Sequence, residues 1–380
     1  MALRAGLAAR HRGGYGVRAD RAVQDAVSAP CEGAAPDPWE LAPAEEHFAR
    51  ALEIQRRLGN RSSEAQTLTN LGILYFTRGD FEESERVAGE ALALARSIDH
   101  KRVMGGALTT IGAVQQMQGR LDEAATTYAA VAAMAHAAGE QATELDAIVN
   151  TAEVLRWRGA LPESRQRYEE GIAMARKLGR KKTLAYAIAG LAELELVEGK
   201  LAAARARYGE ALASYQEFGD RLGTADSRLA VAAVGLAEGN APAAIAAART
   251  VAAEFRAQQV KEREAAAMEL LARALLGAGK SAEAEQAIVT AANLAAKTSD
   301  VNLRLTVEIT HARVIGGAAG AAMLRRAAAE ARAKQLALPA LEARVALAEL
   351  TGDRTASAAV SRDARARGYM LIANRAATAI

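Results

Sequence analysis

The residues of this chain with the widest chemical repertoire are five histidines and one cysteine. The histidines are His11, His47, His100, His136 and His311. They do not follow the close spacings of metal-ligand motifs, and the single cysteine, Cys31, cannot form an internal disulfide. The acidic run at 82–85 lies at a predicted helix start, where it stabilises the positive end of the helix dipole. We therefore expect surface or interface roles for the histidines, no metal site and no nucleophilic cysteine.

Sequence motifs for the common catalytic and cofactor sites are absent from the chain. There is no glycine-rich dinucleotide loop, Walker A loop, kinase catalytic motif, His-Glu-x-x-His or Gly-x-Ser-x-Gly. The sequence therefore predicts a protein that is not an enzyme and holds no cofactor. The alternative is an active site assembled across several repeats, which a metal or cofactor in the purified protein would support.

Composition points to helices. The 380 residues include 48 Lys and Arg against 45 Asp and Glu, and this net charge of +3 argues against nucleic acid as the main partner. Apolar residues make up 51% of the chain but aromatic residues only 4%, and the abundance of Ala, Leu, Glu and Arg predicts an all-α fold. The longest uncharged stretch, 103–119, contains Gly, Thr and Gln, so we expect no membrane span. Without an apolar signal segment, we expect a cytoplasmic protein.

Glycines at a constant interval reveal an internal repeat. One series falls every forty residues, at Gly79, Gly119, Gly159, Gly199, Gly239 and Gly279. A second series lies twenty residues out of phase, at Gly59, Gly139, Gly179 and Gly219, with Asp99, Gln259 and Ser299 at its remaining positions. Glycine tolerates the left-handed conformation that ends many helices. Two series therefore predict two helix ends per forty residues, and each unit is a helix hairpin.

The residues between the glycines resemble the tetratricopeptide repeat (TPR). Leu71-Gly72 with Tyr75, followed by Ser84, Ala88 and Ala91, is similar to the TPR pattern of small and aromatic residues. The second-helix pattern recurs in Ala124 with Tyr128, Ser164 with Tyr168, and Ala204 with Tyr208. The forty-residue period resembles the long repeats of G-protein-signalling modulator scaffolds and of bacterial signalling proteins. HEAT and armadillo repeats have a similar period but lack this pattern.

These features predict an α-α superhelix of roughly seven to eight hairpins with a C-terminal capping helix. We expect a disordered or poorly packed leader over 1–40, a TPR-like array over 41–335 and capping helices over 336–380. The array would open with one helix over 41–58 and close with a pair of helices over 341–350 and 357–375. Each unit is expected to contact mainly its neighbours, so that both ends fray first.

The resemblance implies that first helices line a concave groove that holds a peptide or partner helix. It places Asn70 and Asn150 where an amide can pair with a peptide backbone. The next column that would face the groove contains Ile73, Glu153, Glu193, Arg273 and Arg313. Neighbouring first helices lie about 10 Å apart, so Glu153 and Glu193 are expected to hold one cationic group of a partner between them. Helix-end contacts would come from Phe76, Met117, Arg156 and Trp157, although packing of Trp157 within its hairpin is the simpler interpretation.

We therefore expect a non-enzymatic, protein- or peptide-binding scaffold or sensor in signal transduction, with no small-molecule substrate evident. The alternative is the detached C-terminal sensing region of a bacterial transcriptional regulator or serine/threonine kinase. Its support is the last seventy residues, which resemble the tails of such proteins, together with the incoherent leader.

Overall fold

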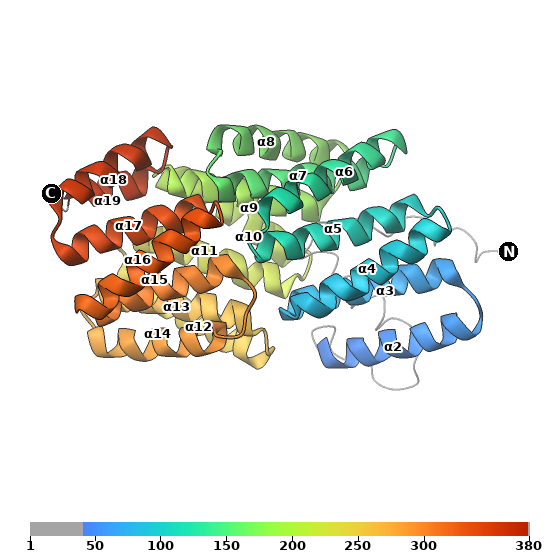
Figure 1. Ribbon diagram of the computed structural model, residues 1–380, viewed down its shortest axis with the longest axis horizontal. Helices are drawn as coiled ribbons and strands as arrows, with labels where there is room; N and C mark the ends of the chain where they lie inside the picture. The colour runs from blue at the N-terminus through green and yellow to red at the C-terminus, as the bar shows by residue number, and fades with distance from the viewer. Residues whose placement is uncertain (1–40, 379–380) are drawn as a thin grey trace.

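The computed structural model describes residues 41–378, which form eighteen α-helices and no strand (Figure 1). The first nine are α2 (Leu41–Arg57), α3 (Arg61–Arg78), α4 (Phe81–Ser97), α5 (Lys101–Met117), α6 (Leu121–Ala137), α7 (Gln141–Arg158), α8 (Leu161–Lys177), α9 (Lys181–Val197) and α10 (Leu201–Glu217). The others are α11 (Arg221–Ala237), α12 (Ala241–Ala257), α13 (Lys261–Gly277), α14 (Ser281–Ala295), α15 (Val301–Ile315), α16 (Gly317–Ala333), α17 (Ala337–Thr351), α18 (Arg354–Ala366) and α19 (Met370–Thr378). Consecutive helices from α3 to α18 form eight hairpins, which confirms the predicted all-α superhelix. The predicted leader over 1–40 lies outside the described residues.

The glycine positions end helices as the spacing predicts. Gly79 follows α3 with φ of 88°, and its N–H donates to the carbonyl of Phe76 at 3.1 Å. In the second series, Asp99 and Gln259 adopt the same left-handed conformation without glycine, with φ of 50° and 57°. A side chain in this conformation costs about 1–2 kcal/mol. The helices therefore end at the same repeat positions even where another residue replaces glycine.

Small residues hold the two helices of a hairpin close together. The hydroxyl of Ser84 donates to the carbonyl of Gly72 at 2.8 Å, and Ser164 repeats this contact with Ala152 at 2.6 Å. Both serines are fully buried. A Cβ atom added to Gly112 would lie 2.7 Å from the ring of Tyr128, which explains why glycine occupies that position.

The first helices of the hairpins form one layer and the second helices another. Contacts between first helices of successive hairpins join α3 to α5, α5 to α7, α7 to α9, α11 to α13, α13 to α15, α15 to α17 and α17 to α19. Within residues 41–378, no comparable contacts join the second helices of successive hairpins. The first helices therefore line the tighter, inner side of the curve, and we call their layer the inner face.

The superhelix also contacts itself across a seam between its early and late hairpins, so units do not touch only their neighbours. Helix α17 contacts α7, and α19 contacts α9 (Figure 1). At the turn after α7, a Cβ atom on Gly159 would lie 2.7 Å from Cβ of Ala337. At the turn after α5, Nζ of Lys334 donates to the carbonyl of Gln118 at 3.4 Å. We call this set of contacts the seam. It joins the turns that follow α3, α5, α7 and α9 to the part of the chain from α13 to α19.

An apolar cluster forms the core of the seam. Its large side chains from the early hairpins are Leu121, Tyr128, Val154 and Trp157, and those from the late hairpins are Val301, Leu305, Ile309, Leu324 and Leu336. Burying one side chain of this size contributes about 1.5–3 kcal/mol. The seam is therefore a second hydrophobic core, additional to the packing within and between adjacent hairpins.

The C-terminal end differs from the sequence prediction. Three helices, α17, α18 and α19, stand where a pair was expected, because Gly368 interrupts the segment predicted as one helix over 357–375. Gly368 has φ of 84°, a left-handed turn that sends α19 back against α17 and α18. The predicted opening helix over 41–58 is present as α2.

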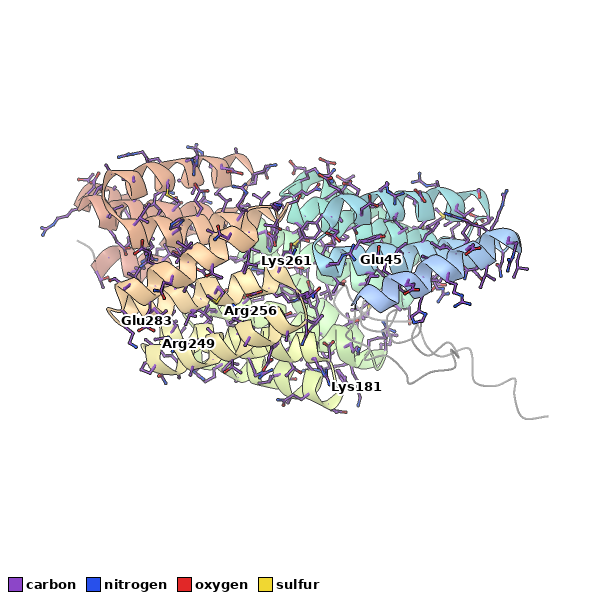
Figure 2. The ribbon with its side chains drawn as sticks, turned by 90° about the horizontal axis from the view of Figure 1, so that it is seen from below. Glu45, Lys181, Arg249, Arg256, Lys261 and Glu283 are labelled. Atoms are coloured by element: carbon purple, nitrogen blue, oxygen red, sulfur yellow. The ribbon has the colours of Figure 1, made fainter. Side chains whose placement is uncertain are left out.

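Exposed side chains of the outer helices form ion pairs. Figure 2 shows Arg249 of α12 beside Glu283 of α14, with 2.5 Å between the guanidinium and carboxylate. Such exposed pairs contribute only about 0–1 kcal/mol, so side-chain packing dominates the stability of the array. Among the described helices, none is long and apolar enough to cross a bilayer.

Candidate functional site

A network of charged and phenolic side chains lies in the middle of the inner face. Arg156 of α7 lies between the carboxylates of Glu153 and Glu193, with N–O separations of 3.6 and 3.9 Å. Tyr186 donates its hydroxyl to Glu153, and Tyr208 donates to Glu193 at 2.6 Å. We call these five residues the central network. It joins α7, α9 and α10 by side-chain hydrogen bonds and ion pairs.

Second-helix tyrosines reach this network from the outer layer. Tyr128, Tyr168 and Tyr208 occupy one repeat position at forty-residue intervals, and each is buried. Burial raises the pKa of Tyr168, and also that of Tyr208, where Glu193 adds to the effect. These phenols therefore stay protonated and act as hydrogen-bond donors at neutral pH. Burial opposes the charge of Arg156, but Tyr168, Glu193 and Glu153 outweigh it and raise the pKa of its guanidinium.

The predicted cation site between Glu153 and Glu193 is occupied by a residue of the chain itself. Glu153 and Glu193 do share one cationic group, and that group is the guanidinium of Arg156. Two carboxylates against one guanidinium leave the network with one excess negative charge. The side chains of Glu153, Glu193 and Arg156 keep 18%, 34% and 19% of their surfaces exposed, so a partner can still reach them. The geometry permits a cationic group to join or displace Arg156.

Arginines gather on the inner face near the C-terminus. Arg273 of α13 lies 3.0 Å from Glu269, and Arg375 of α19 binds both Glu342 and Glu349, at 2.8 and 2.6 Å. Arg313 of α15 stands between these two pairs in helix order. Its pKa is lowered first by burial and then by the charge of Arg375. The arginines of the predicted column therefore stand beside glutamates that the column did not include, Glu269, Glu342 and Glu349.

Three predicted groove residues are buried. Ile73, Asn150 and Trp157 keep only 2%, 2% and 8% of their surfaces exposed, so none is available to a partner in this conformation. Trp157 belongs to the seam cluster, whose other members come from α5, α6, α7, α15, α16 and α17 and none from α8, the second helix of its own hairpin. The amide nitrogen of Asn150 has no hydrogen-bond partner in the described part of the chain.

Two further predicted contacts also belong to the seam. Phe76 and Met117 are partly buried against the same cluster as Trp157. The apolar character of these helix ends therefore serves contact with the chain itself. Asn70 is half-buried, and its side-chain oxygen accepts a hydrogen bond from Gln66 at 3.1 Å, which leaves its amide nitrogen for other partners.

Sequence reasoning missed three members of this inner-face chemistry, Tyr186, Tyr208 and Arg375. Tyr208 was identified only as part of a packing column, although its forty-residue spacing from Tyr168 was the available signal. Arg375 lies beyond the regular repeats, so no periodic column pointed to it. Within residues 41–378, no group of three or more His, Cys, Asp or Glu side chains is arranged to hold a metal ion.

Stacked hairpins with a small-residue interface and a polar inner face define a helical-repeat protein of the TPR type. The sequence matches the family model described as MalT-like TPR region over residues 40–352, and the chain belongs to this family. No curated protein matches the sequence.

Solved structures with the same fold include three Rap proteins. A Rap protein complexed with Competence and Sporulation Factor is 14% identical, with a TM-score of 0.64 and coverage of 96% of this chain and 99% of that chain. The Rap conjugation gene regulator of plasmid pLS20, in complex with the Phr* peptide, is 11% identical, with a TM-score of 0.55 and coverage of 96% and 94%. The apo form of RapI is 10% identical, with a TM-score of 0.53 and coverage of 74% and 98%. At these identities the likeness concerns the fold.

Proposed function

We propose that this chain is a non-enzymatic scaffold or sensor in signal transduction that binds a protein or peptide partner along its inner face. The observation that carries the proposal is the central network, in which charged groups on adjacent first helices are paired yet partly exposed. A wholly structural set of ion pairs would gain little from this placement, because half-buried charges lose hydration without full compensation. An extended segment bound across α7 and α9 would contact the charged groups of both helices.

The solved relatives support this use of the fold. One Rap structure contains Competence and Sporulation Factor and another contains the Phr* peptide. The excess negative charge of the central network favours a partner with a Lys or Arg at this point, since opposite charges at a partly desolvated site attract more strongly than in water. Asn70, Glu153, Arg156, Glu193, Arg273 and Arg313 are the residues that we retain for the partner site.

Selection from a random peptide library displayed on phage tests the proposal with the full chain. We expect selected peptides to carry a basic residue and to bind Glu193→Gln about tenfold more weakly, which corresponds to about 1.4 kcal/mol. Glu283→Gln, on outer helix α14, is the matched control and is expected to bind as the wild type does. Circular dichroism should show equal helicity in all three proteins. Failure to enrich any peptide, or equal binding by both variants, would refute the proposal.

A second candidate is the sensing region of a larger transcriptional regulator or kinase. The matched family describes a region of a protein rather than a whole protein, and this favours the idea. An effector domain encoded in frame or next to this chain, whose activity changes when the chain is added in trans, would support it. A cytoplasmic location stays a prediction from the sequence.

A further inference from the structure

The outer helices of the array differ in net charge. Within their bounds, α4, α6 and α14 each contain two more acidic than basic side chains, whereas α16 and α18 each contain two more basic than acidic ones. The basic side chains are Arg325, Arg326 and Arg332 of α16 and Arg354, Arg362 and Arg365 of α18. The outer layer therefore becomes positively charged towards the C-terminal end of the array.

Several of these arginines are not neutralised by the chain itself. On an earlier outer helix, Arg249 pairs with Glu283 of the following hairpin at 2.5 Å. Within residues 41–378, four exposed arginines of α16 and α18 take part in no such ion pair and in no side-chain hydrogen bond. They are Arg325, Arg332, Arg362 and Arg365, and we call the face that they form the basic surface.

The carboxylates of α16 and α18 are engaged by other arginines. Asp363 accepts from both Arg344 and Arg367, at 2.5 and 2.9 Å, so two guanidinium groups share one carboxylate. Glu330 pairs with Arg304 of α15. These contacts leave the positive charge of the basic surface uncompensated, and an anionic group from a partner would compensate it.

Arginine and alanine alternate along one side of α16. Arg325 and Arg332 are seven residues apart, Ala322 and Ala329 belong to the same row, and all four are exposed. Residues at intervals of three and four lie on one side of an α-helix, and seven residues correspond to a rise of about 10.5 Å. Carboxylates seven residues apart on a partner helix have the same separation. The alanines leave room for the backbone of that helix to approach.

Helix α18 repeats the position of the arginine. Its N-cap residue, Asp353, follows the N-cap residue of α16, Gly316, by 37 residues. With this offset Arg362 is the counterpart of Arg325, and Arg365 lies one turn further along the same helix. Both α16 and α18 pack against α17 (Figure 1). The basic surface therefore extends over two neighbouring outer helices.

We propose that the basic surface binds an acidic helix of a protein partner, with Asp or Glu side chains at seven-residue intervals facing Arg325 and Arg332. The guanidinium fork matches a carboxylate in bidentate geometry, and complementary charge speeds association and fixes register. This surface belongs to the outer layer, so the inference does not rest on the function proposed for the inner face.

Nucleic acid and lipid fit this surface less well. A continuous row of phosphates would meet the carboxylates of Glu330 and Asp363 as well as the arginines. Neither α16 nor α18 contains an aromatic residue on which a base could stack. Neither helix exposes a large apolar side chain that could enter a bilayer interface.

Fluorescence anisotropy with the full chain tests the proposal. The probe is a labelled alanine-rich peptide, stapled as a helix, with Glu at every seventh position. One control peptide has Gln at these positions, and another has the same composition with its Glu residues spread around the helix. A DNA duplex of random sequence and vesicles of phosphatidylcholine and phosphatidylserine represent the other anions. We expect the Glu-row helix to bind most tightly, with an affinity that falls as salt is added.

Substitutions locate the binding surface. Arg325→Gln with Arg332→Gln should weaken binding of the Glu-row helix by about tenfold. The matched control is Arg50→Gln with Arg57→Gln, since these exposed arginines of α2 are also seven residues apart, but Glu46 and Glu53 alternate with them. This control should bind as the wild type does, and circular dichroism should show equal helicity in all variants.

Four results would overturn the proposal. They are failure of the wild type to bind the Glu-row helix, equal binding of the two Glu peptides, equal losses in the two double variants, and tighter binding of DNA or vesicles. Glu193→Gln keeps the two proposals apart, because it should not change binding of the Glu-row helix. A change there would place that helix on the inner face and would also contradict the basic surface.

Discussion

Gly190 in α9 shows how tightly a single position can be constrained beneath the central network. A Cβ atom there would lie 2.3 Å from the ring of Tyr168, which is buried and contacts Arg156. Gly190→Ala must therefore displace the tyrosine, and we expect it to destabilise the protein by about 1–3 kcal/mol, as overpacking usually does. Chemical denaturation measures this change.

Gly209→Ala is the matched control for that substitution. Gly209 lies inside α10, and nothing stands within 4 Å of the position its Cβ would take. Since alanine is the better helix former by up to about 1 kcal/mol, this variant should be more stable than the wild type. Equal effects of the two substitutions would show that the contact with Tyr168 is not limiting.

Asp300 should make stability depend on pH. Its carboxylate caps α15 by accepting from the backbone N–H of Leu303 at 2.9 Å, a contact that lowers its pKa. Burial, with a smaller contribution from Glu262 and Glu153, outweighs this and raises the pKa from 3.8 to about 6. A carboxyl whose pKa is higher in the folded state stabilises the protein below about pH 4, and this contribution is lost as pH rises through 6. The loss should amount to about 1–3 kcal/mol.

Asp300→Asn isolates this effect because asparagine caps helices as well as aspartate does. We expect the variant to match the wild type near pH 4 and to be more stable above pH 6, as measured by urea denaturation across that range. Asp353→Asn, at the exposed cap of α18, controls for the change of cap. A difference between Asp300→Asn and the wild type that stays constant with pH would contradict the assignment.

Individual site residues were predicted unevenly from sequence. Glu153, Glu193 and Arg273 occupy the inner face because their column follows the forty-residue period. Ile73 occupies the same column but is buried, and Phe76, on the same helix, packs against the seam cluster. A repeat pattern fixes the direction of a side chain relative to its own hairpin, but it contains no information on what covers that hairpin from a distant part of the chain.

At the scale of helices, the two ends of the array should differ in local stability, although the repeat pattern predicts that both fray. Helix α2 packs on α3, whereas α19 packs on α17, α18 and α9. Opening α19 would therefore expose apolar surface on three helices, and opening α2 on fewer. We expect amides of α2 to exchange with solvent faster than those of α19 in hydrogen-exchange mass spectrometry. Equal exchange at the two ends would contradict a stabilising seam.

Helix bounds were accessible from sequence because their determinants are local. Glycine spacing and small-residue columns act within one hairpin, so the pattern of one unit predicts the next. The division of the last segment into α18 and α19 was missed because Gly368 lies outside the forty-residue series. The signal was nevertheless present, since a glycine within a predicted helix raises the expectation of a left-handed turn.

At the scale of the whole molecule, the seam joins the early hairpins to the late hairpins, so contacts are not limited to neighbouring units. Phe76 and Met117 were interpreted as contacts to a partner because apolar helix ends on a repeat array indicate an interface. For Trp157, packing within its own hairpin was the simpler interpretation. The interface is real, but it is made with helices of the same chain. The seam therefore fixes the pitch of the superhelix, and with it the spacing between the central network and the arginines near the C-terminus.

Two glycines of the same series separate the contribution of the seam from that of backbone strain. Gly159 and Gly239 have φ of 83° and 87°, so alanine at either position costs about 1–2 kcal/mol in the left-handed conformation. Only Gly159 faces the seam, where its Cβ would lie 2.7 Å from Ala337, whereas nothing lies within 4 Å of Gly239. Gly159→Ala should therefore destabilise the protein by about 1–3 kcal/mol more than Gly239→Ala. Small-angle scattering should show a larger radius of gyration for Gly159→Ala alone. Equal stability and equal dimensions in the two variants would mean that the early and late hairpins do not hold each other, and the inner face would then lack a fixed spacing along which to align a partner.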